Sequence, residues 1–585
     1  MGQYERAIDL FEQRLTIARE IGNRSGEGRT LNNLGVLFQW QDQPGVAIVF
    51  YKQSVNVREG IRQALTDPTL LQSYTDTVAG TYRGLADLLL EQGRILEAQQ
   101  VLELLKVEEL REFTDDERAG GTVPEVTLLP QEAAILAEHT TLIEFGQQLR
   151  DCETTDCVNL SSLRDQRDQQ FSQYRTAVAS LTTFIQDRLE DGDDPNLLLN
   201  PTGFATKAKE IIDQQPGTVV VYPLVLEDKL WLLWAADGRV ISRREIPVSR
   251  VELGNAVIQF RALIEDRNSD LAEVQALGQQ LYTWLIAPIE AELAANQDIQ
   301  HLIFSLDRTT RYLPMGALYD GERYLIEKYT VATILSAALT DVSQRSPVGT
   351  EGVSILGAGV SQGSAEFNPL PYVPRELDAI IQEADPNDTA GLYAGQKLLD
   401  PDFTYTALRD SLDGQQFLHI ATHGEFVPGD RDASYLLLGN DEKLPIPDIE
   451  TLATYLEDVH LVVLSACQTA LGGPNEEGLE IAGLGYYFLS SQVDAVMASL
   501  WNVSDSSTSL LMQRFYRNLA EGTVTAPITK AEAIQAAQLS FIQSPDVLTA
   551  DEERIIGQRE TTASSETPLS HPYFWAPFTL IGNSL

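Results

Sequence analysis

Two stretches decide the fold of this chain: Phe417-Leu-His-Ile-Ala-Thr-His423-Gly-Glu, and Leu461-Val-Val-Leu-Ser-Ala-Cys467-Gln-Thr. Each is a short apolar run, typical of a buried strand, that ends at a chemically reactive side chain. Open α/β folds build their sites at the carboxyl ends of parallel strands, so we expect His423 and Cys467 to meet at one sheet edge. A thiol beside an imidazole has the parts of a nucleophile and its base. The two runs therefore predict a cysteine peptidase.

The pattern around these runs predicts a mostly parallel sheet with helices on both faces. From about residue 216, apolar runs such as Thr218-Val-Val-Val-Tyr222 and Leu230-Trp-Leu-Leu-Trp234 predict strands, with a hairpin turn at Asp237-Gly238. A second α/β unit begins near residue 350 and includes a strand at Ala495-Val-Met-Ala-Ser499. Alternating strands and helices of this kind are typical of parallel sheets.

The first 115 residues contain an internal repeat. Gly2-Gln-Tyr-Glu-Arg-Ala7-Ile is answered by Asp42-Gln-Pro-Gly-Val-Ala47-Ile and by Gly93-Arg-Ile-Leu-Glu-Ala98. Each copy opens an amphipathic helix, and small residues such as Gly35 let paired helices pack closely. The first helix of the chain corresponds to the second helix of a two-helix repeat, so we expect further repeats upstream. Residues 116–215 then predict a polar helical linker.

Acidic residues dominate the charge of the chain. There are 42 basic and 85 acidic residues, which gives a formal net charge of −43. Such a surface repels phosphate backbones and anionic membranes, so we expect no direct nucleic-acid or membrane partner. A basic protein or substrate would be attracted, although an acidic surface that only keeps the chain soluble explains the charge equally well.

Three cysteines are too few for a disulfide framework. Cys152 and Cys157 could pair or bind metal, but without a second ligand pair nearby we interpret them as ordinary thiols. No run reaches the roughly 18 apolar residues of a membrane span, and the start of the chain lacks a secretory signal. We therefore expect a cytoplasmic protein without metal or cofactor.

The chain from about residue 216 to 585 resembles the CHAT domain, a caspase- and separase-like family found beside tetratricopeptide repeats. The matching phrases are Arg311-Tyr-Leu-Pro-Met-Gly-Ala-Leu, Leu370-Pro-Tyr-Val-Pro-Arg-Glu-Leu, His419-Ile-Ala-Thr-His423-Gly, Leu464-Ser-Ala-Cys467-Gln-Thr, Ala498-Ser-Leu-Trp-Asn-Val-Ser-Asp505 and His571-Pro-Tyr-Phe-Trp-Ala-Pro-Phe-Thr-Leu-Ile-Gly582. The resemblance implies a non-catalytic part at 216–349 and a catalytic part at 350–585. The repeats at 1–115 resemble a tetratricopeptide solenoid, which would recruit a protein substrate or regulator. Cyanobacteria are rich in such proteins.

The expected chemistry assigns one role to each residue. Cys467 is the nucleophile, and His423 is the base and then the acid for the leaving amine. Backbone N–H groups of Gly424 and Cys467 would hold the oxyanion. The resemblance implies that Asp505 lies at the base of the pocket for the residue before the scissile bond, where it would select Arg or Lys, with Trp501 as a wall. Asp505 could equally cap a helix, and Trp501 could be a core aromatic.

Other interpretations stay open from the sequence. His419 lies inside the first strand and is expected to be a hydrogen-bonded structural residue, although His419, His423 and Glu425 could also be read as metal ligands. Gly359-Val-Ser361-Gln-Gly363 matches the nucleophile elbow of a serine esterase, but no helix is predicted directly after it, so we expect a loop near the site. A catalytically inert scaffold that keeps the fold is the main alternative to a peptidase.

Overall fold

The computed structural model describes residues 2–62, 68–114, 126–155, 158–190, 204–236, 242–337, 339–364, 366–384, 391–427, 430–465, 468–469, 478–501, 505–543 and 568–585. The chain divides into two compact units, Met1–Thr206 (unit 1) and Lys207–Leu585 (unit 2), and each is described by itself.

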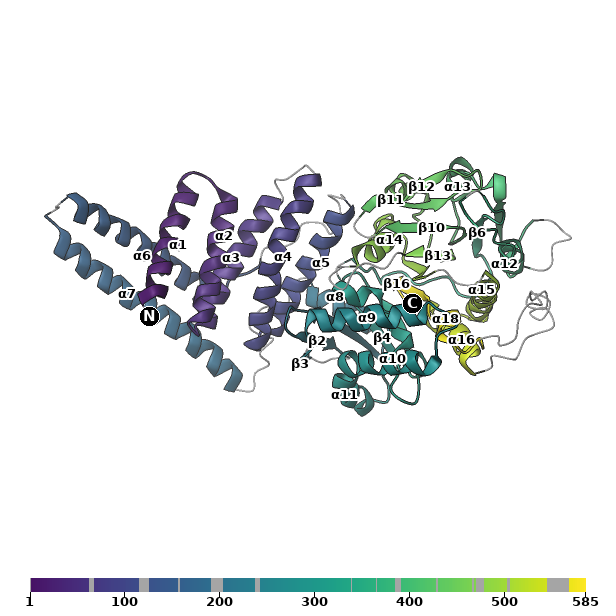
Figure 1. Cartoon of the computed structure of the whole chain (residues 1–585), viewed down its shortest axis with the longest axis horizontal. Coiled ribbons are helices and arrows are strands. Elements are labelled where there is room, and N and C mark those ends of the chain that lie inside the picture. Colours follow the sequence, from purple (N-terminus) through teal and green to yellow (C-terminus); the bar gives the residue numbers. More distant parts are fainter. Residues whose placement is uncertain are drawn as a thin grey trace. The chain divides into compact units, whose positions relative to one another are not determined.

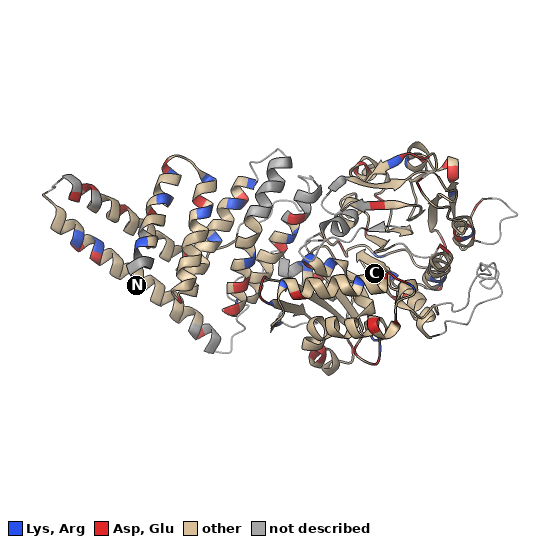
Figure 2. Ribbon diagram, viewed as in Figure 1, with Lys and Arg blue, Asp and Glu red and all other residues tan. Residues whose placement is uncertain are grey.

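Unit 1 is helical (Figure 1). Its helices are α1 (Gly2–Glu20), α2 (Arg24–Trp40), α3 (Pro44–Arg62), α4 (Pro68–Glu91), α5 (Ile95–Thr114), α6 (Pro130–Thr155) and α7 (Leu160–Glu190). Both signs of charge are distributed along these helices (Figure 2).

The turns after α1, α2 and α4 share one backbone geometry. Gly22, Asp42 and Gly93 have φ values of 68°, 58° and 77°, in the left-handed region. In each turn, the next residue donates its backbone N–H to a carbonyl five positions earlier, as in Asn23 to Ala18. This is the pattern of a Schellman helix end. The internal repeat therefore corresponds to a repeated helix–turn–helix geometry, while its assignment to the tetratricopeptide class stays a prediction.

A buried ion cluster joins α3, α5 and the start of α6. Lys52 is fully buried and donates to Glu97 at 2.5 Å and to Glu132 at 2.8 Å. Arg94, 1 % exposed, donates to the same two carboxylates. Helix α6 and helix α7, expected as a linker, also share apolar packing with α3 through Val49, Leu181 and their neighbours.

Cys152, in α6, is disulfide-bonded. The interpretation of Cys152 as an ordinary thiol is therefore wrong. Cysteine spacing left pairing open, and the fold decides whether two sulfurs approach. The other two cysteines, Cys157 and Cys467, lie outside the described residues.

Unit 2 is built on one sheet of twelve strands, in the order β3-β2-β1-β4-β5-β16-β15-β13-β9-β6-β8-β7. These strands are β1 (Thr218–Val225), β2 (Leu230–Ala235), β3 (Ser242–Ile246), β4 (His301–Phe304), β5 (Thr330–Thr333), β6 (Ser354–Gly359), β7 (Ile381–Gln382), β8 (Tyr393–Leu399), β9 (Phe417–Ala421), β13 (Leu461–Ser465), β15 (Ala495–Ser499) and β16 (Phe578–Gly582). All neighbouring pairs are parallel except β1–β2, β2–β3 and β15–β16. The predicted mostly parallel sheet is confirmed.

The last strand joins the two predicted α/β parts. Strand β16 lies between β5 and β15, so residues on both sides of position 350 belong to the same sheet. A second sheet, in the order β12-β11-β10-β14, contains β10 (Gly424–Val427), β11 (Asp430–Leu437), β12 (Lys443–Pro445) and β14 (Gln468–Thr469).

Helix α8 (Phe204–Gln214) spans the boundary between the units, and the α-helices in the described part of unit 2 after it are α9 (Arg250–Ile264), α10 (Leu271–Leu285), α11 (Glu290–Ala295), α12 (Val373–Ile380), α13 (Tyr405–Ser411), α14 (Leu479–Ser490), α15 (Asp505–Ala520), α16 (Lys530–Gln543) and α18 (Pro572–Trp575). Two glycines of β6 let α12 pack closely on the sheet. A Cβ at Gly357 would lie 3.0 Å from Leu377 Cδ2, and a Cβ at Gly359 would lie 2.5 Å from Val373 Cγ1.

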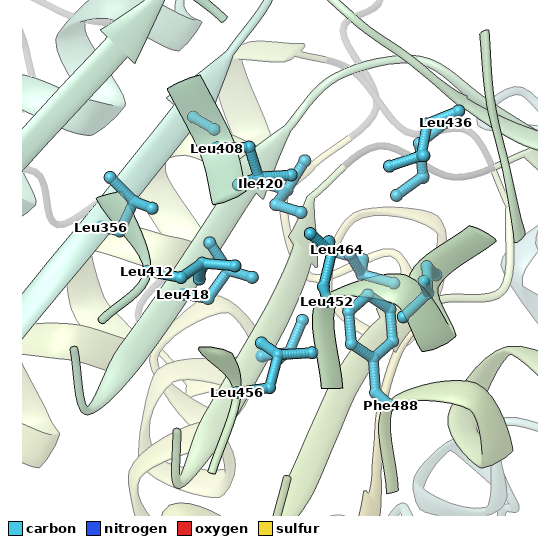
Figure 3. Packing of buried hydrophobic residues seen from close by; sticks show 14 of the residues in the cluster. Leu356, Leu408, Leu412, Leu418, Ile420, Leu436, Leu452, Leu456, Leu464 and Phe488 are labelled. Atoms are coloured by element: carbon cyan, nitrogen blue, oxygen red, sulfur yellow. The ribbon is translucent and has the colours of Figure 1, made fainter. Parts of the chain in front are cut away.

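The core next to the candidate site is an apolar cluster to which both β9 and β13 contribute. Leu418 and Ile420 of β9 and Leu464 of β13 are buried in it together with Leu356 of β6 and Phe488 of α14 (Figure 3). Alternate side chains of the central strands thus point into one layer, which fixes the strand register.

Candidate active site

The two reactive runs lie side by side in the sheet. Strands β9 and β13 are parallel, and the last pair of their ladder is Ala421 with Ser465. The chain pairs again a few residues later, where Glu425 of β10 lies opposite Gln468 of β14. His423 therefore stands between two pairings with the second run. Cys467 itself lies outside the described residues.

His423 is held by the loop that connects β6 to α12, residues 360–372, of which the structure describes 360–364 and 366–372. The Nε2 atom of His423 lies 2.8 Å from the carbonyl oxygen of Asn368. The Phe367 ring stacks on the imidazole with centroids 4.9 Å apart and an interplanar angle of 26°. A carbonyl can only accept, so Nε2 carries the proton and the neutral ring keeps Nδ1 as its acceptor.

The surroundings of His423 favour its neutral form. Burial lowers the pKa of the imidazole below its ordinary 6.5, and the hydrogen bond to Asn368 opposes this shift only in part. A neutral imidazole near pH 7 is the form that can accept a proton from a thiol.

Gly424 begins β10 directly after the imidazole. It is buried and pairs with Leu436 of β11, and the N–H of Leu437 donates to the carbonyl of His423 at 2.8 Å. The main chain on both sides of His423 is thus fixed by sheet pairing. The role of the Gly424 N–H toward an oxyanion stays a prediction.

Asp505 is the first residue of α15 and is half-buried. Its Oδ2 atom accepts the backbone N–H of Tyr372 at 2.7 Å, so it holds the end of the loop that precedes α12. Burial raises the pKa of Asp505 to about 6, and the nearby Glu376 carboxylate adds to the shift, while the Tyr372 hydrogen bond opposes it. Selection of a basic substrate residue by Asp505 stays a prediction.

Trp501 is 3 % exposed. Its indole Nε1 donates to the carbonyl of Tyr573 at 3.3 Å, and the guanidinium of Arg261 lies 5.3 Å from the ring centroid. Arg261 also donates to the carbonyl of Leu500 at 2.8 Å, which fixes the main chain directly after β15. The role of Trp501 as a pocket wall stays a prediction.

His419 has a structural environment, as predicted. It is fully buried in β9, with Nε2 2.7 Å from Glu376 and Nδ1 3.2 Å from the hydroxyl of Tyr516. Among the residues that the structure describes, no three His, Cys, Asp or Glu side chains lie close enough together to hold a metal ion.

Ser361 stands in the loop that was expected near the site, and this expectation is confirmed. Its hydroxyl donates to Asp400 Oδ2 at 2.7 Å, and the first helix after it, α12, begins only at Val373. The same loop supplies Phe367 and Asn368 to the imidazole. Sequence reasoning missed these two residues, because a backbone carbonyl has no residue-type signal and a single Phe in a proline-rich loop has several explanations.

None of the helices in the described ranges combines the length and apolar character that a membrane crossing requires. Unit 1 contains a cavity of about 940 Å³ between α1, α2, α6 and α7. Its lining includes Phe38, Leu142 and Phe171, with Glu12 and His139 as paired polar groups 2.9 Å apart.

Three solved structures are similar to the chain at low identity. The Saccharomyces cerevisiae separase–securin complex aligns with a TM-score of 0.43 and 9 % identity over 99 % of this chain and 46 % of that one, so the chain spans less than half the length of that structure. The Arg-specific cysteine proteinase gingipain R aligns with a TM-score of 0.29 and 9 % identity, over 55 % of this chain and 69 % of that one. The complex of the Porphyromonas gingivalis RgpB pro- and mature domains aligns with a TM-score of 0.28 and 10 % identity, over 57 % and 75 %.

A search of curated proteins found no match. The family profile described as CHAT domain matches residues 275–583, which is more than half of the chain and includes every strand from β4 to β16. The chain therefore belongs to the CHAT-domain family.

Proposed function

We propose that the chain is a cysteine endopeptidase with Cys467 as nucleophile and His423 as its base. The observation that carries the proposal is the pairing on both sides of the two residues. Ala421 lies opposite Ser465 and Glu425 lies opposite Gln468, and His423 and Cys467 each stand within these bounds. Membership of the CHAT-domain family, which resembles caspase-like peptidases, supports the same chemistry.

In the proposed reaction, Nδ1 of His423 takes the thiol proton of Cys467, and the thiolate attacks the scissile carbonyl carbon. The carbonyl oxygen becomes an oxyanion that accepts hydrogen bonds from the N–H groups of Gly424 and Cys467. The C–N bond then breaks as the imidazolium protonates the leaving amine. Water, deprotonated by the same ring, hydrolyses the thioester and restores the thiol. The Asn368 carbonyl supports both transfers because it keeps the proton of the neutral ring on Nε2.

Asp505 is the proposed selector of a basic residue before the scissile bond. Its carboxylate is half-buried and begins α15, only six positions after the end of β15, the strand beside β13. One of its oxygens, Oδ2, accepts from Tyr372, and Oδ1 is the oxygen proposed to face a guanidinium or ammonium group. The net charge of −43 would also attract a basic substrate.

Unit 1 is proposed to recruit a protein substrate or regulator. Its cavity has the volume and the mixed apolar and polar lining of ligand sites in general. Recruitment by unit 1 and cleavage by unit 2 would then combine binding and catalysis in one chain.

A positional peptide library tests the proposal. The purified full chain should cleave peptides after Arg or Lys, and the variants Cys467→Ala and His423→Ala should each lose activity by at least about a thousandfold. Iodoacetamide should alkylate Cys467 much faster than any other thiol, and His423→Ala should abolish that difference. Slow alkylation of Cys467 with no cleavage would instead indicate an inert scaffold, and activity that survives Cys467→Ala but not Ser361→Ala would indicate a serine esterase.

A further inference from the structure

The loop that holds His423 is itself poorly buried. Gln362, Gly363, Ser364, Glu366 and Asn368 are all exposed, and Phe367 is only half-buried. Apolar burial of this loop therefore comes mainly from Val360, which is buried in the core cluster, and from Phe367, which packs against that cluster. Yet the carbonyl of Asn368 must stay within hydrogen-bond distance of Nε2 if it is to control the imidazole.

The entrance of the loop is fixed by Asp400. Strands β6 and β8 are parallel, with Gly359 opposite Leu399, so Asp400 is the first residue beyond the shared edge. Its Oδ1 accepts the backbone N–H of Ser361 at 2.7 Å and that of Gln362 at 3.2 Å, while its Oδ2 accepts the Ser361 hydroxyl at 2.7 Å.

Asp400 makes these bonds from an unfavourable backbone conformation. Its φ is +52°, a region that residues other than Gly adopt at a cost. Such strain persists where the surroundings determine the conformation. Here the three hydrogen bonds that the loop donates to the Asp400 carboxylate stabilise this conformation.

The exit of the loop is fixed by Asp505. It accepts the N–H of Tyr372, the residue immediately before α12, at 2.7 Å. Between the two ends, the N–H of Leu370 donates to the carbonyl of Ser361 at 2.9 Å, which closes the base of the loop. The segment is therefore a closed loop tied to the fold by one carboxylate at each end.

We propose that Asp400 and Asp505 are positioning residues for His423. They fix the two ends of loop 360–372, and the loop in turn holds the imidazole through the Asn368 carbonyl and the Phe367 ring. Asp400 has no part in the proposed substrate pocket, so its effect is on the orientation of the base alone. The relevance to catalysis rests on the proposed function, but the positioning itself does not.

The test measures the His423 ring directly. In the full chain with Cys467→Ala, the chain's six histidines are followed by NMR against pH, and His423→Ala identifies the resonances of interest. Asp400→Ala removes the three hydrogen bonds between the Asp400 carboxylate and the start of the loop. Tyr372→Pro removes the N–H at the exit, at a φ of −91°, together with the tyrosine ring that Arg375 faces at 5.8 Å, and leaves the Asp505 carboxylate in place. Asp270→Ala is the matched control, because Asp270 accepts a backbone N–H at 2.9 Å at the start of α10, away from the loop.

Release of the loop should expose His423 and remove its Nε2–H···O bond. We expect its titration midpoint to rise toward 6.5 in Asp400→Ala and Tyr372→Pro, with loss of the slowly exchanging Nε2–H signal. Asp400→Asn should shift less, since Asn tolerates a positive φ and its amide oxygen can still accept one N–H. If Asp400→Ala fails to fold, Asp400→Asn and Tyr372→Pro decide the question.

An unchanged midpoint and an unchanged Nε2–H signal in these variants would overturn the proposal. The titration needs no turnover, so an inactive protein can still confirm the positioning. In the protein with Cys467 intact, Asp400→Ala should lower kcat by about tenfold to a hundredfold with little change in KM, and Asp400→Asn should restore part of it.

Discussion

Replacement of Lys52 by Met should strongly destabilise unit 1. Lys52 is fully buried and binds the carboxylates of Glu97 and Glu132, and it also donates to the carbonyl of Thr127 at 3.0 Å. Met can fill the space but cannot donate a hydrogen bond. Two buried carboxylates would then share the single guanidinium of Arg94.

The size of the effect follows from the cost of leaving a buried charge unpaired, and the pKa of Glu97 shows its direction. Removing one partner of a buried ion pair typically costs about 3–5 kcal/mol. Separately, burial disfavours the charged form of Glu97, yet the charges of Lys52 and Arg94 outweigh burial and lower its pKa from 4.5 to about 2. Lys52 and Arg94 together therefore stabilise the charged carboxylate in the folded state, and Lys52→Met removes one of these two contributions. Because the folded-state pKa is the lower one, this stability is complete above about pH 4.5 and is lost as the pH falls through about 2.

The assay is urea-dependent hydrogen exchange of the full chain, read in α3, α5 and α6. At pH 7 we expect the opening free energy of these helices to fall by about 3–5 kcal/mol in Lys52→Met. The matched control is Arg164→Met, because Arg164 pairs with Glu153 at 2.9 Å on the surface, where both side chains are about half exposed. An exposed pair should contribute no more than about 1 kcal/mol.

The pH dependence separates lost charge pairing from lost packing. The penalty of Lys52→Met should shrink as the pH is lowered, since protonation removes the uncompensated charge of a carboxylate. A penalty below about 1 kcal/mol, or one as small as that of Arg164→Met, would refute the account of the cluster. A penalty independent of pH would refute its electrostatic part.

Three further predictions concern the site and the repeats. The ratio of kcat/KM for basic peptides to kcat/KM for matched neutral peptides should decline below about pH 6. Burial raises the pKa of Asp505 to about 6, and the protonated carboxyl has no charge with which to bind a basic residue. A ratio that does not change with pH would exclude Asp505 as selector. Phe367→Ala should move the acid limb of the kcat/KM profile upward toward pH 6.5, because it uncovers the imidazole of His423, whose pKa is lowered by burial. Gly84→Ala should stabilise unit 1 by up to about 1 kcal/mol, because the added Cβ meets no atom within 4 Å. Gly35→Ala should destabilise unit 1, because the added Cβ would lie 3.0 Å from the ring of Tyr51 in α3. Equal melting temperatures of the two variants would contradict both expectations.

The local patterns of the chain were sufficient to predict its elements. The apolar runs at Phe417 and Leu461 form neighbouring parallel strands, and the proline-rich segment after β6 forms a loop near His423. These predictions hold because strand formation and turn chemistry depend on neighbours in the sequence. The repeated phrases at the start of the chain likewise correspond to one repeated turn geometry.

Contacts between distant residues could not be predicted in this way. Lys52 looks like an ordinary surface residue in the sequence, yet its carboxylate partners lie 45 and 80 positions away. The imidazole of His423 is held by a carbonyl 55 positions earlier, and every residue has a carbonyl. The disulfide of Cys152 could not be predicted either, since spacing alone does not show which sulfurs meet.

By itself, the sequence determined the two apolar strands that precede His423 and Cys467, the helical repeats before them, and the CHAT family. Only the tertiary structure decided that β16 joins the two α/β parts into one sheet, and that Asp400 and Asp505 tie the loop that holds His423. The physical reason is that periodicity encodes which face of an element is buried. Which partners then meet depends on how the whole chain packs.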